Sequence, residues 1–244
     1  MTSVDLLELL QHGEVGFIGQ LAESSNLAVV VDVTFTRDGG QEDCCWGIFK
    51  PEAGERYLHD FPAGLWRRER AAYLLSECLG WDIVPPTVVR EVEPLGVGSL
   101  QYYVDNDGSH YFPLYETRTD LHPQFLRMAV FDLLVNNTDR KSGHVLLERS
   151  ENASHVDHVW GIDQGLCFHQ DPKLRTVIWE FAHETIPSEL VDAVEPLAAE
   201  VPEEVALLLA PEEVAALKSR ASRIVRLPWL PEPQSEFPYP WPLV

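Results

Sequence analysis

The first hundred residues alternate between short apolar runs and polar turns, which is the pattern of a β-rich unit. Residues 4–12 carry apolar side chains at helical spacing and predict a short amphipathic helix. A longer helix is expected over residues 65–79, and Gly80 is a typical stop for it. The predicted strands cover residues 15–21, 27–35, 44–50, 87–92 and 99–104. After the first helix, the expected order of elements is therefore β-β-β-α-β-β.

The following residues are mainly helical by the same reasoning. Residues 105–120 are polar and irregular, and we interpret them as a connection between two lobes. Residues 122–135 place apolar side chains on one face of a helix. Acidic helices are predicted further along the chain, over residues 188–199, 202–209 and 211–226.

This order of elements predicts an α+β fold with two lobes of different character. A β-rich N-lobe is expected over residues 1–104 and a helical C-lobe over residues 105–227. Residues 228–244 form a tail that is rich in proline and in aromatic side chains. Because this composition is too aromatic for a free linker, we expect the tail to lie extended against the body of the protein.

Two isolated acids stand in turn-like segments next to predicted strands. Asp139 lies within Asn136–His144, which precedes an apolar run, and Asp163 follows apolar residues 159–162. A hairpin between the two segments would bring both carboxylates to one end. Phosphoryl transfer needs such a pair, with one acid to orient the attacking hydroxyl and one to hold Mg²⁺ on the phosphates. The alternative is a plain turn and a strand-end acid without chemistry.

Charge narrows the choice of partners. The formal net charge of −21 gives a surface that repels nucleic-acid phosphates and anionic lipid headgroups. We therefore expect no nucleic-acid partner and no membrane partner, although solubility alone also explains most of this charge. The sequence contains no apolar run of about 18 residues and does not open like a signal peptide, so we expect a cytoplasmic protein.

The four cysteines change this picture little. They lack Cys-x-x-Cys spacing, which argues against a structural zinc site and against a disulfide framework. We expect them to be small, buried, apolar side chains.

Six stretches carry a likeness to a known family: IFKP, DFPAGLWRRERAAYLLSECLGWDIVPPTVV, GSLQYYV, NNTDRKSGH, GIDQGLCFH and KLRTVIW. As a set they resemble the actinobacterial proteins described as phosphatidylinositol 3-/4-kinase-like, remote relatives of lipid kinases and of HipA-type bacterial protein kinases. The resemblance extends over residues 14–226. It implies an atypical protein-kinase-like fold that binds ATP with Mg²⁺ or Mn²⁺. It does not imply a substrate, because a fold hosts many functions.

On the nucleotide side, the resemblance assigns Lys50 to the phosphates and Glu69 to an ion pair that fixes Lys50 in place. The residues themselves leave open a strand-end lysine and a solvated helix acid. Ser24, Ser25 and Asn26 take the place of the glycine-rich loop, where backbone N–H groups face the phosphates, although the sequence has no Gly-x-Gly there.

The end of the fifth strand fits the hinge of a kinase. Gln101, Tyr103 and Val104 would meet the edge of the adenine ring, mainly through backbone groups. This assignment follows from the order of the elements, since backbone contacts leave little trace in side-chain identity.

The catalytic residues follow from the second half of the resemblance. Asp139 would orient the acceptor hydroxyl, and Arg140 and Lys141 would steady the transferring phosphoryl group. Asp163 resembles the aspartate of the DFG motif and should bridge the metal to the phosphates. His144 stands where many kinases carry a metal-binding asparagine, and imidazole would favour Mn²⁺ over Mg²⁺. His144 could instead contact phosphate directly or be structural.

The expected function is ATP- and metal-dependent transfer of the γ-phosphoryl group to a hydroxyl of a soluble small molecule or of a protein. A nucleotide-binding pseudokinase and a nucleotidyl transferase with the same cleft remain as alternatives. Intact Lys50, Asp139 and Asp163 argue against the pseudokinase. After Asp163, the basic pair Lys173 and Arg175 could bind the phosphate or carboxylate of an acidic small substrate.

Overall fold

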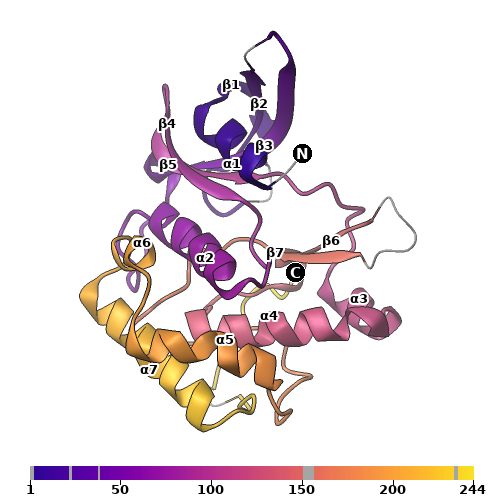
Figure 1. The fold of residues 1–244 in the computed structure, drawn as a ribbon, viewed down its shortest axis with the longest axis vertical. Helices are drawn as coiled ribbons and strands as arrows, with labels where there is room; N and C mark the ends of the chain where they lie inside the picture. Colours follow the sequence, from indigo (N-terminus) through magenta and orange to yellow (C-terminus); the bar gives the residue numbers. More distant parts are fainter. Residues whose placement is uncertain (1–2, 22–23, 38, 151–156, 234–235) are drawn as a thin grey trace.

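The computed structural model describes residues 3–21, 24–37, 39–150, 157–233 and 236–244. Figure 1 shows a β-rich lobe above a helical lobe. The N-terminal elements are α1 (Ser3–His12), β1 (Glu14–Gln20), β2 (Val29–Thr36), β3 (Glu42–Pro51), the 3₁₀ turn η1 (Glu52–Gly54), α2 (Trp66–Leu79), β4 (Thr87–Val92) and β5 (Gly96–Tyr102). The predicted β-β-β-α-β-β order is confirmed.

The upper lobe is built on a five-stranded sheet in the order β1-β2-β3-β5-β4, with antiparallel neighbours. Val29, Val31 and Val33 of β2 are buried at every second position, as the alternation in the sequence requires. Helix α1 covers this face of the sheet, and its Leu9 and Leu10 join the same apolar cluster. Burial of this face fixes the register of the strands, because a shift of one residue would turn the valines to solvent.

Helix α2 connects the two lobes. It ends at Gly80, which adopts the left-handed conformation (φ 64°) that glycine takes without steric cost. The buried face of the helix, including Ala71, Ala72 and Leu75, belongs to the apolar cluster of the lower lobe. The helix also contacts β4 and β5 of the upper lobe, so it packs against both lobes.

The lower lobe contains α3 (Tyr111–Thr117), η2 (Thr119–Leu121), α4 (His122–Val135), η3 (Ser142–His144), β6 (Val145–Glu148), β7 (His158–Gly161), α5 (Ser188–Ala199), α6 (Glu203–Ala206) and α7 (Pro211–Arg226). Helix α4 is buried over most of its length, and α5 packs against α7. β6 and β7 form the predicted antiparallel hairpin, with Val145 opposite Gly161. The two-lobed α+β fold, β-rich above and helical below, is confirmed.

Two details of the prediction are wrong. The connection over residues 105–120 contains helix α3, which is stabilised by a distant contact: buried Tyr111 donates a hydrogen bond from its hydroxyl to Glu180 Oε2 at 2.6 Å. The helix expected over residues 202–209 is a single turn, Glu203–Ala206.

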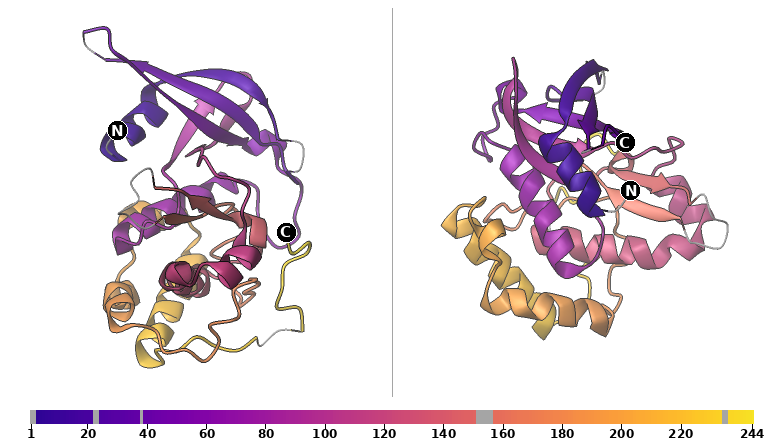
Figure 2. Two further views of the ribbon diagram at one scale, coloured as in Figure 1. Left: turned by 90° about the vertical axis from the view of Figure 1, so that its right-hand side faces the viewer. Right: turned by 45° about the horizontal axis from the view of Figure 1, so that its top comes forward.

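The tail packs on the body, as its aromatic content predicts. Pro238 accepts a hydrogen bond from the Thr176 N–H at 3.1 Å, and Leu243 accepts one from the Ser142 N–H at 2.7 Å. Figure 2 shows the tail along the side of the helical lobe, with the C-terminus at the level where the lobes meet. The tail therefore ends beside the segment that carries Asp139.

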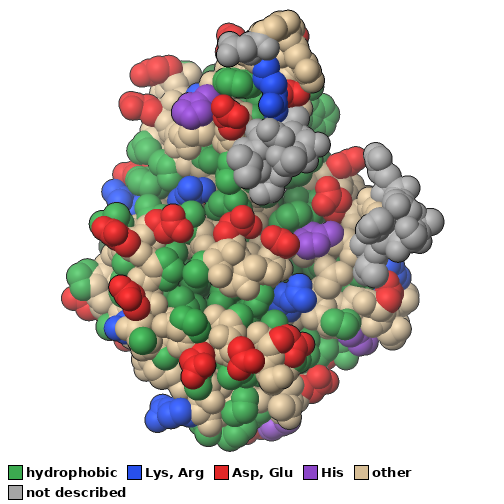
Figure 3. Space-filling model, viewed as in Figure 1, with side chains coloured by type: hydrophobic (Ala, Val, Ile, Leu, Met, Phe, Trp, Pro, Cys, Tyr) green, Lys and Arg blue, Asp and Glu red, His purple; other side chains and the backbone are tan. Residues whose placement is uncertain are grey.

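Acidic side chains are distributed over both lobes on the face shown in Figure 3. Within the described residues, each helix is too short or too polar to span a membrane. All four cysteines are free thiols. Cys167 is buried as expected, but Cys44 and Cys78 are exposed and Cys45 is partly exposed, so the expectation of buried cysteines was wrong for these three.

Candidate active site

Lys50 lies near the end of β3, opposite Ser99 of β5. The two strands run close here because residue 98 is glycine: a Cβ on Gly98 would lie 2.3 Å from the Lys50 carbonyl oxygen. Lys50 Nζ lies 2.6 Å from Glu69 Oε1 and 2.8 Å from Asp163 Oδ1. Burial alone would lower the pKa of Lys50, but the two carboxylates outweigh it and raise that pKa above its ordinary value. Lys50 is therefore a fixed cation between the lobes.

Glu69 joins three parts of the site. It lies on α2 and its side chain is buried, which excludes the solvated helix acid. Oε1 binds Lys50, while Oε2 accepts the backbone N–H of Gln164 at 3.0 Å. Gln164 directly follows Asp163. The Glu69 carboxylate therefore contacts both Lys50 and the backbone next to Asp163.

Asp163 has an unusual backbone, with a φ of 59°. This left-handed conformation is uncommon for residues other than glycine and places the Asp163 carboxylate towards Lys50 and His144. Burial by itself would raise the pKa of Asp163, but the surrounding basic groups, with the Lys50 ammonium foremost, together outweigh burial and hold that pKa well below its usual range. Asp163 is therefore ionised at neutral pH.

The turn that carries Asp139 is ordered by its own side chains. Asn136 ends α4 in the left-handed conformation, and Asn137 Oδ1 accepts the Asp139 N–H at 2.9 Å. Asp139 Oδ2 lies 2.8 Å from Lys141 Nζ. Burial raises the pKa of Asp139, although the Lys141 ammonium acts against this shift. A carboxylate with a raised pKa is the stronger base.

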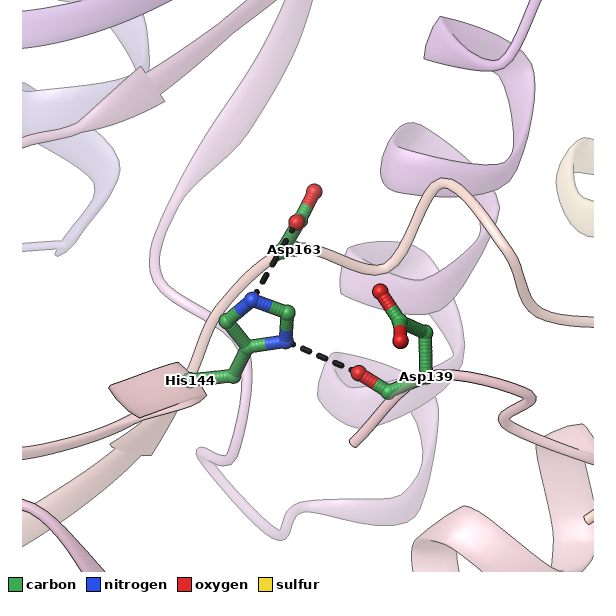
Figure 4. Close-up of side chains that lie close together, drawn as sticks. All are labelled: Asp139, His144 and Asp163. Atoms are coloured by element: carbon green, nitrogen blue, oxygen red, sulfur yellow. Dashed lines mark hydrogen bonds and ion pairs between the residues drawn. The ribbon is translucent and has the colours of Figure 1, made fainter. Parts of the chain in front are cut away.

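His144 lies between the two acids (Figure 4). Its Nδ1 is 3.0 Å from the Asp139 carbonyl oxygen, which can only accept, so Nδ1 carries the proton. The Lys141 N–H is a poorer partner for Nδ1, at 3.5 Å. Burial lowers the pKa of His144 to about 4, so the imidazole is neutral at pH 7. Its Nε2 lone pair then faces Asp163 Oδ2 at 3.4 Å.

This geometry fits a divalent metal ion. One ligand atom each from Asp139, His144 and Asp163 lies within 4.8 Å of the others. The neutral Nε2 of His144 and the ionised Asp163 Oδ2 are both electron-pair donors, and a cation between them would satisfy both. Carboxylate oxygens suit Mg²⁺ and Mn²⁺, and an imidazole nitrogen suits Mn²⁺ better.

Arg140 differs from its predicted role. Its side chain is fully buried, and Nη2 lies 3.0 Å from Asp132 Oδ1 on α4. Nη1 donates to the backbone carbonyls of His144 and Ile162. The guanidinium therefore faces the interior and cannot reach a phosphoryl group in the cleft. We propose that it positions the Asp139 turn and the strand before Asp163.

Arg140 and Lys141 both follow Asp139, but only Lys141 lies where it could contact a transferring phosphoryl group. It lines the cleft next to His144 and holds Asp139 through their ion pair.

The turn after β1 lies at the mouth of the cleft. Ser24 and Ser25 line it beside Lys50. Asn26 lines a smaller adjoining pocket, and its Oδ1 accepts the Arg56 N–H at 2.9 Å. The structure thus brings the predicted phosphate-binding residues together with Lys50. Residues 22 and 23 of the same loop lie outside the described part.

All three predicted hinge residues line the cavity. Gln101 is buried within the sheet, and its Nε2 donates to Thr87 Oγ1 at 2.9 Å, so its side chain supports the cleft from inside. Tyr103 and Val104 follow β5 and line the cavity. The Tyr103 N–H is bonded to the Trp46 carbonyl at 3.0 Å.

The cavity between the lobes measures about 920 Å³. Apolar side chains face it from both lobes: Ala28 just before β2 and Ile48 of β3 in the upper lobe, and Leu146 and Ile162 from the β6–β7 hairpin and its end. Lys50 and Asp163 lie in the same cavity. A space with apolar walls and one charged end suits a planar base attached to phosphates.

Sequence reasoning missed several residues of this cavity, and three of them come from segments to which it assigned no role in the site. Arg56 comes from the loop after β3, and Pro242 and Val244 come from the tail. None lies in a recognisable motif, and each reaches the cleft only through contacts between distant segments. Lys173 is one of the two basic residues that we expected to bind an acidic substrate. Its Nζ lies 2.8 Å from Asp60 Oδ2, and this carboxylate balances its charge.

The chain is similar in sequence to several known proteins. It is 34% identical to Protein Rv2133c of Mycobacterium tuberculosis (strain ATCC 25618 / H37Rv), over 96% of this chain and 94% of that protein. It is 28% identical to phosphatidylinositol 4-kinase gamma 4 of Arabidopsis thaliana, over 63% of this chain but only 34% of the plant protein. This supports a distant relationship to the plant kinases. No protein family model matches the chain.

Two solved structures with partial likeness are described as kinases. The Helicobacter pylori proinflammatory kinase CtkA overlaps with a TM-score of 0.49 and 13% identity, over 90% of this chain and 94% of that one. The Rio2 kinase from Chaetomium thermophilum, solved with ADP/Mg²⁺ and phosphoaspartate, overlaps with a TM-score of 0.39 and 12% identity, over 90% and 73%. At such scores, nothing about the chemistry of this chain follows from them.

Proposed function

We propose that this chain, which belongs to the family of Protein Rv2133c, is an ATP-dependent phosphotransferase that moves the γ-phosphoryl group to a hydroxyl. One observation carries the proposal. The Lys50 ammonium contacts both the Glu69 and the Asp163 carboxylates, and Asp163 lies within ligand distance of Asp139 and His144. A lysine fixed by a helix acid beside a metal-binding acid is the arrangement that kinases use.

Each side chain has a distinct task in this reaction. Lys50 would bind the α- and β-phosphates as a point charge that Glu69 keeps in place. Asp139, with its raised pKa, would accept the hydrogen bond of the acceptor hydroxyl and orient it in line with the γ-phosphorus. Lys141 would hold Asp139 and add positive charge near the transferring group. A divalent ion held by Asp163 and His144 would supply charge neutralisation at the phosphates.

The acceptor we propose is a soluble small molecule or a protein side chain in the cytoplasm. The names of the plant relatives raise phosphatidylinositol as an alternative, but the chain matches between 24% and 34% of their length. A net charge of −21 opposes approach to an anionic membrane surface. A lipid acceptor is therefore an arm of the test rather than the proposal.

The test is label transfer from ATP. Wild-type protein and Asp139→Asn are incubated with metal and with γ- or α-labelled ATP, using a metabolite extract, a protein extract or phosphatidylinositol vesicles as acceptor. Transfer of the γ-label, lost in Asp139→Asn, supports the proposal. Transfer of the α-label would identify a nucleotidyl transferase. Tight ATP binding without transfer in any arm would identify a pseudokinase.

A further inference from the structure

Arg56 brings a positive charge to the wall of the cleft from outside any kinase motif. It lies in the loop between β3 and α2 and lines the cavity together with Ser24, Ser25 and Lys50. The sequence lacks a Gly-x-Gly turn at the phosphate end of this cavity. A further cation at this end would add a phosphate contact to those assigned to Lys50 and to the two serines.

The loop of Arg56 is attached to the turn that carries the two serines. The Arg56 N–H donates to Asn26 Oδ1 at 2.9 Å, and the Leu27 N–H donates to the Gly54 carbonyl at 3.1 Å. A Cβ on Gly54 would lie 2.3 Å from the Leu27 Cβ, so the close approach requires glycine. These contacts join the two loops into one wall and fix the place of Arg56 beside the serines.

The acids near Arg56 are occupied by other donors. Glu52 Oε2 accepts the indole N–H of Trp66 at 2.6 Å. The two oxygens of Glu55 accept the backbone N–H groups of Gly64 and Leu65 at 2.8 and 2.7 Å. Within the described residues, Arg56 forms no ion pair with a carboxylate.

The other cations of the cleft are already balanced. Lys50 contacts two carboxylates, and Lys141 contacts Asp139. Arg56 is thus the cation of this cavity whose charge no described carboxylate meets. A nucleoside triphosphate brings several negative charges, and a guanidinium binds phosphate oxygens in bidentate fashion.

We propose that Arg56 binds the β- and γ-phosphates of the nucleotide next to Ser24 and Ser25, and that its charge compensates for the missing glycine-rich turn. This inference rests on the proposed function, because it assumes a nucleoside triphosphate in the cleft. It adds a phosphate-binding residue and predicts that affinity depends on the number of phosphates.

The test measures binding of ATP, ADP and AMP with Mg²⁺ by titration calorimetry. Arg56→Gln removes the charge, and Arg56→Lys keeps it without the planar fork. Arg67→Gln is the matched control, since Arg67 is an exposed arginine nearby that stacks on Trp66 and does not line the cleft. Melting temperatures of all variants are recorded to show that each is folded.

Arg56→Gln is expected to weaken ATP binding by about 10-fold or more, ADP binding by less, and AMP binding by less than about 2-fold. Arg56→Lys should fall between wild type and Arg56→Gln, and Arg67→Gln should match wild type. Equal affinities in Arg56→Gln and wild type would overturn the inference alone, as would an equal loss for all three nucleotides. Failure of wild type to bind any nucleotide would overturn the proposed function as well.

Discussion

Asp132 and Arg140 form an ion pair from which water is excluded: Oδ1 lies 3.0 Å from Nη2, and both side chains are 0% exposed. The pair links α4 to the turn that carries Asp139. A buried guanidinium that loses its carboxylate is left uncompensated, and such losses cost about 3–5 kcal/mol. Burial of this pair therefore makes the Asp139 turn dependent on a helix residue outside the cleft.

We predict that Asp132→Ala lowers the free energy of unfolding by about 3–5 kcal/mol, measured by urea denaturation. The matched control is Asp120→Ala, which breaks an exposed pair with Arg118 and should leave unfolding close to wild type. A small effect of Asp132→Ala would show that Arg140 finds water or another acceptor when its partner is removed.

Asp163→Ala is predicted to abolish the metal-dependent part of the stabilisation by ATP. The variant removes an ionised ligand from the three-residue cluster. In wild type, ATP with metal at about 100 times the dissociation constant should add about 2.7 kcal/mol to stability. Melting curves with ATP, with and without metal, measure the effect. If metal raises the melting temperature equally in both proteins, the ion is held elsewhere.

Asp139→Asn is predicted to retain ATP affinity and to lose turnover by about 100-fold or more. The residue acts on the acceptor hydroxyl, so its loss belongs to the chemical step. Asparagine keeps the shape of the side chain but cannot act as a base. Calorimetry gives the affinity, and single-turnover transfer of γ-label gives the rate. Normal turnover would place the base elsewhere.

The tail should affect the cleft that it lines. The Leu243 carbonyl accepts the N–H of Ser142, three residues after Asp139, and Pro242 and Val244 reach the cavity. Removal of residues 236–244 is predicted to raise KM for ATP by at least about 3-fold, because lost wall contacts weaken ground-state binding. The control is Trp241→Ala, a change at a largely exposed tail residue that does not line the cavity. Unchanged KM after truncation would make the tail a support for the lower lobe alone.

Much of the fold could be predicted because local patterns determine it. Alternation at Val29, Val31 and Val33 indicates a strand buried on one face, and Gly80 marks the end of α2. Helix α3 was missed because its stability depends on Tyr111, whose partners Phe125 and Glu180 lie far along the chain. Propensity within residues 105–120 carries no information on such contacts.

The same distinction applies to the site. Lys50 and Asp163 could be found from short motifs, and the structure brings them together. The inward direction of the Arg140 side chain could not be found in this way, because it depends on Asp132 and on the backbone carbonyls of two other segments. The place of Arg56 depends on the packing of two loops that are far apart in the sequence. Sequence gives residue types, while tertiary contacts decide which of them face the cleft.

His144 provides the last prediction. Burial lowers its pKa to about 4, so the neutral form is favoured in the folded protein and protons compete with metal only in strong acid. Metal activation should therefore be nearly constant from about pH 8 to about pH 6, a range in which an ordinary histidine would protonate.

His144→Asn replaces an imidazole nitrogen by an amide oxygen and should shift the metal preference from Mn²⁺ towards Mg²⁺. His144→Ala should weaken metal activation more than ATP affinity. Activation curves for both metals across this pH range, in wild type and both variants, measure these effects. Identical curves in all three proteins would leave His144 as a support for the Asp139 turn.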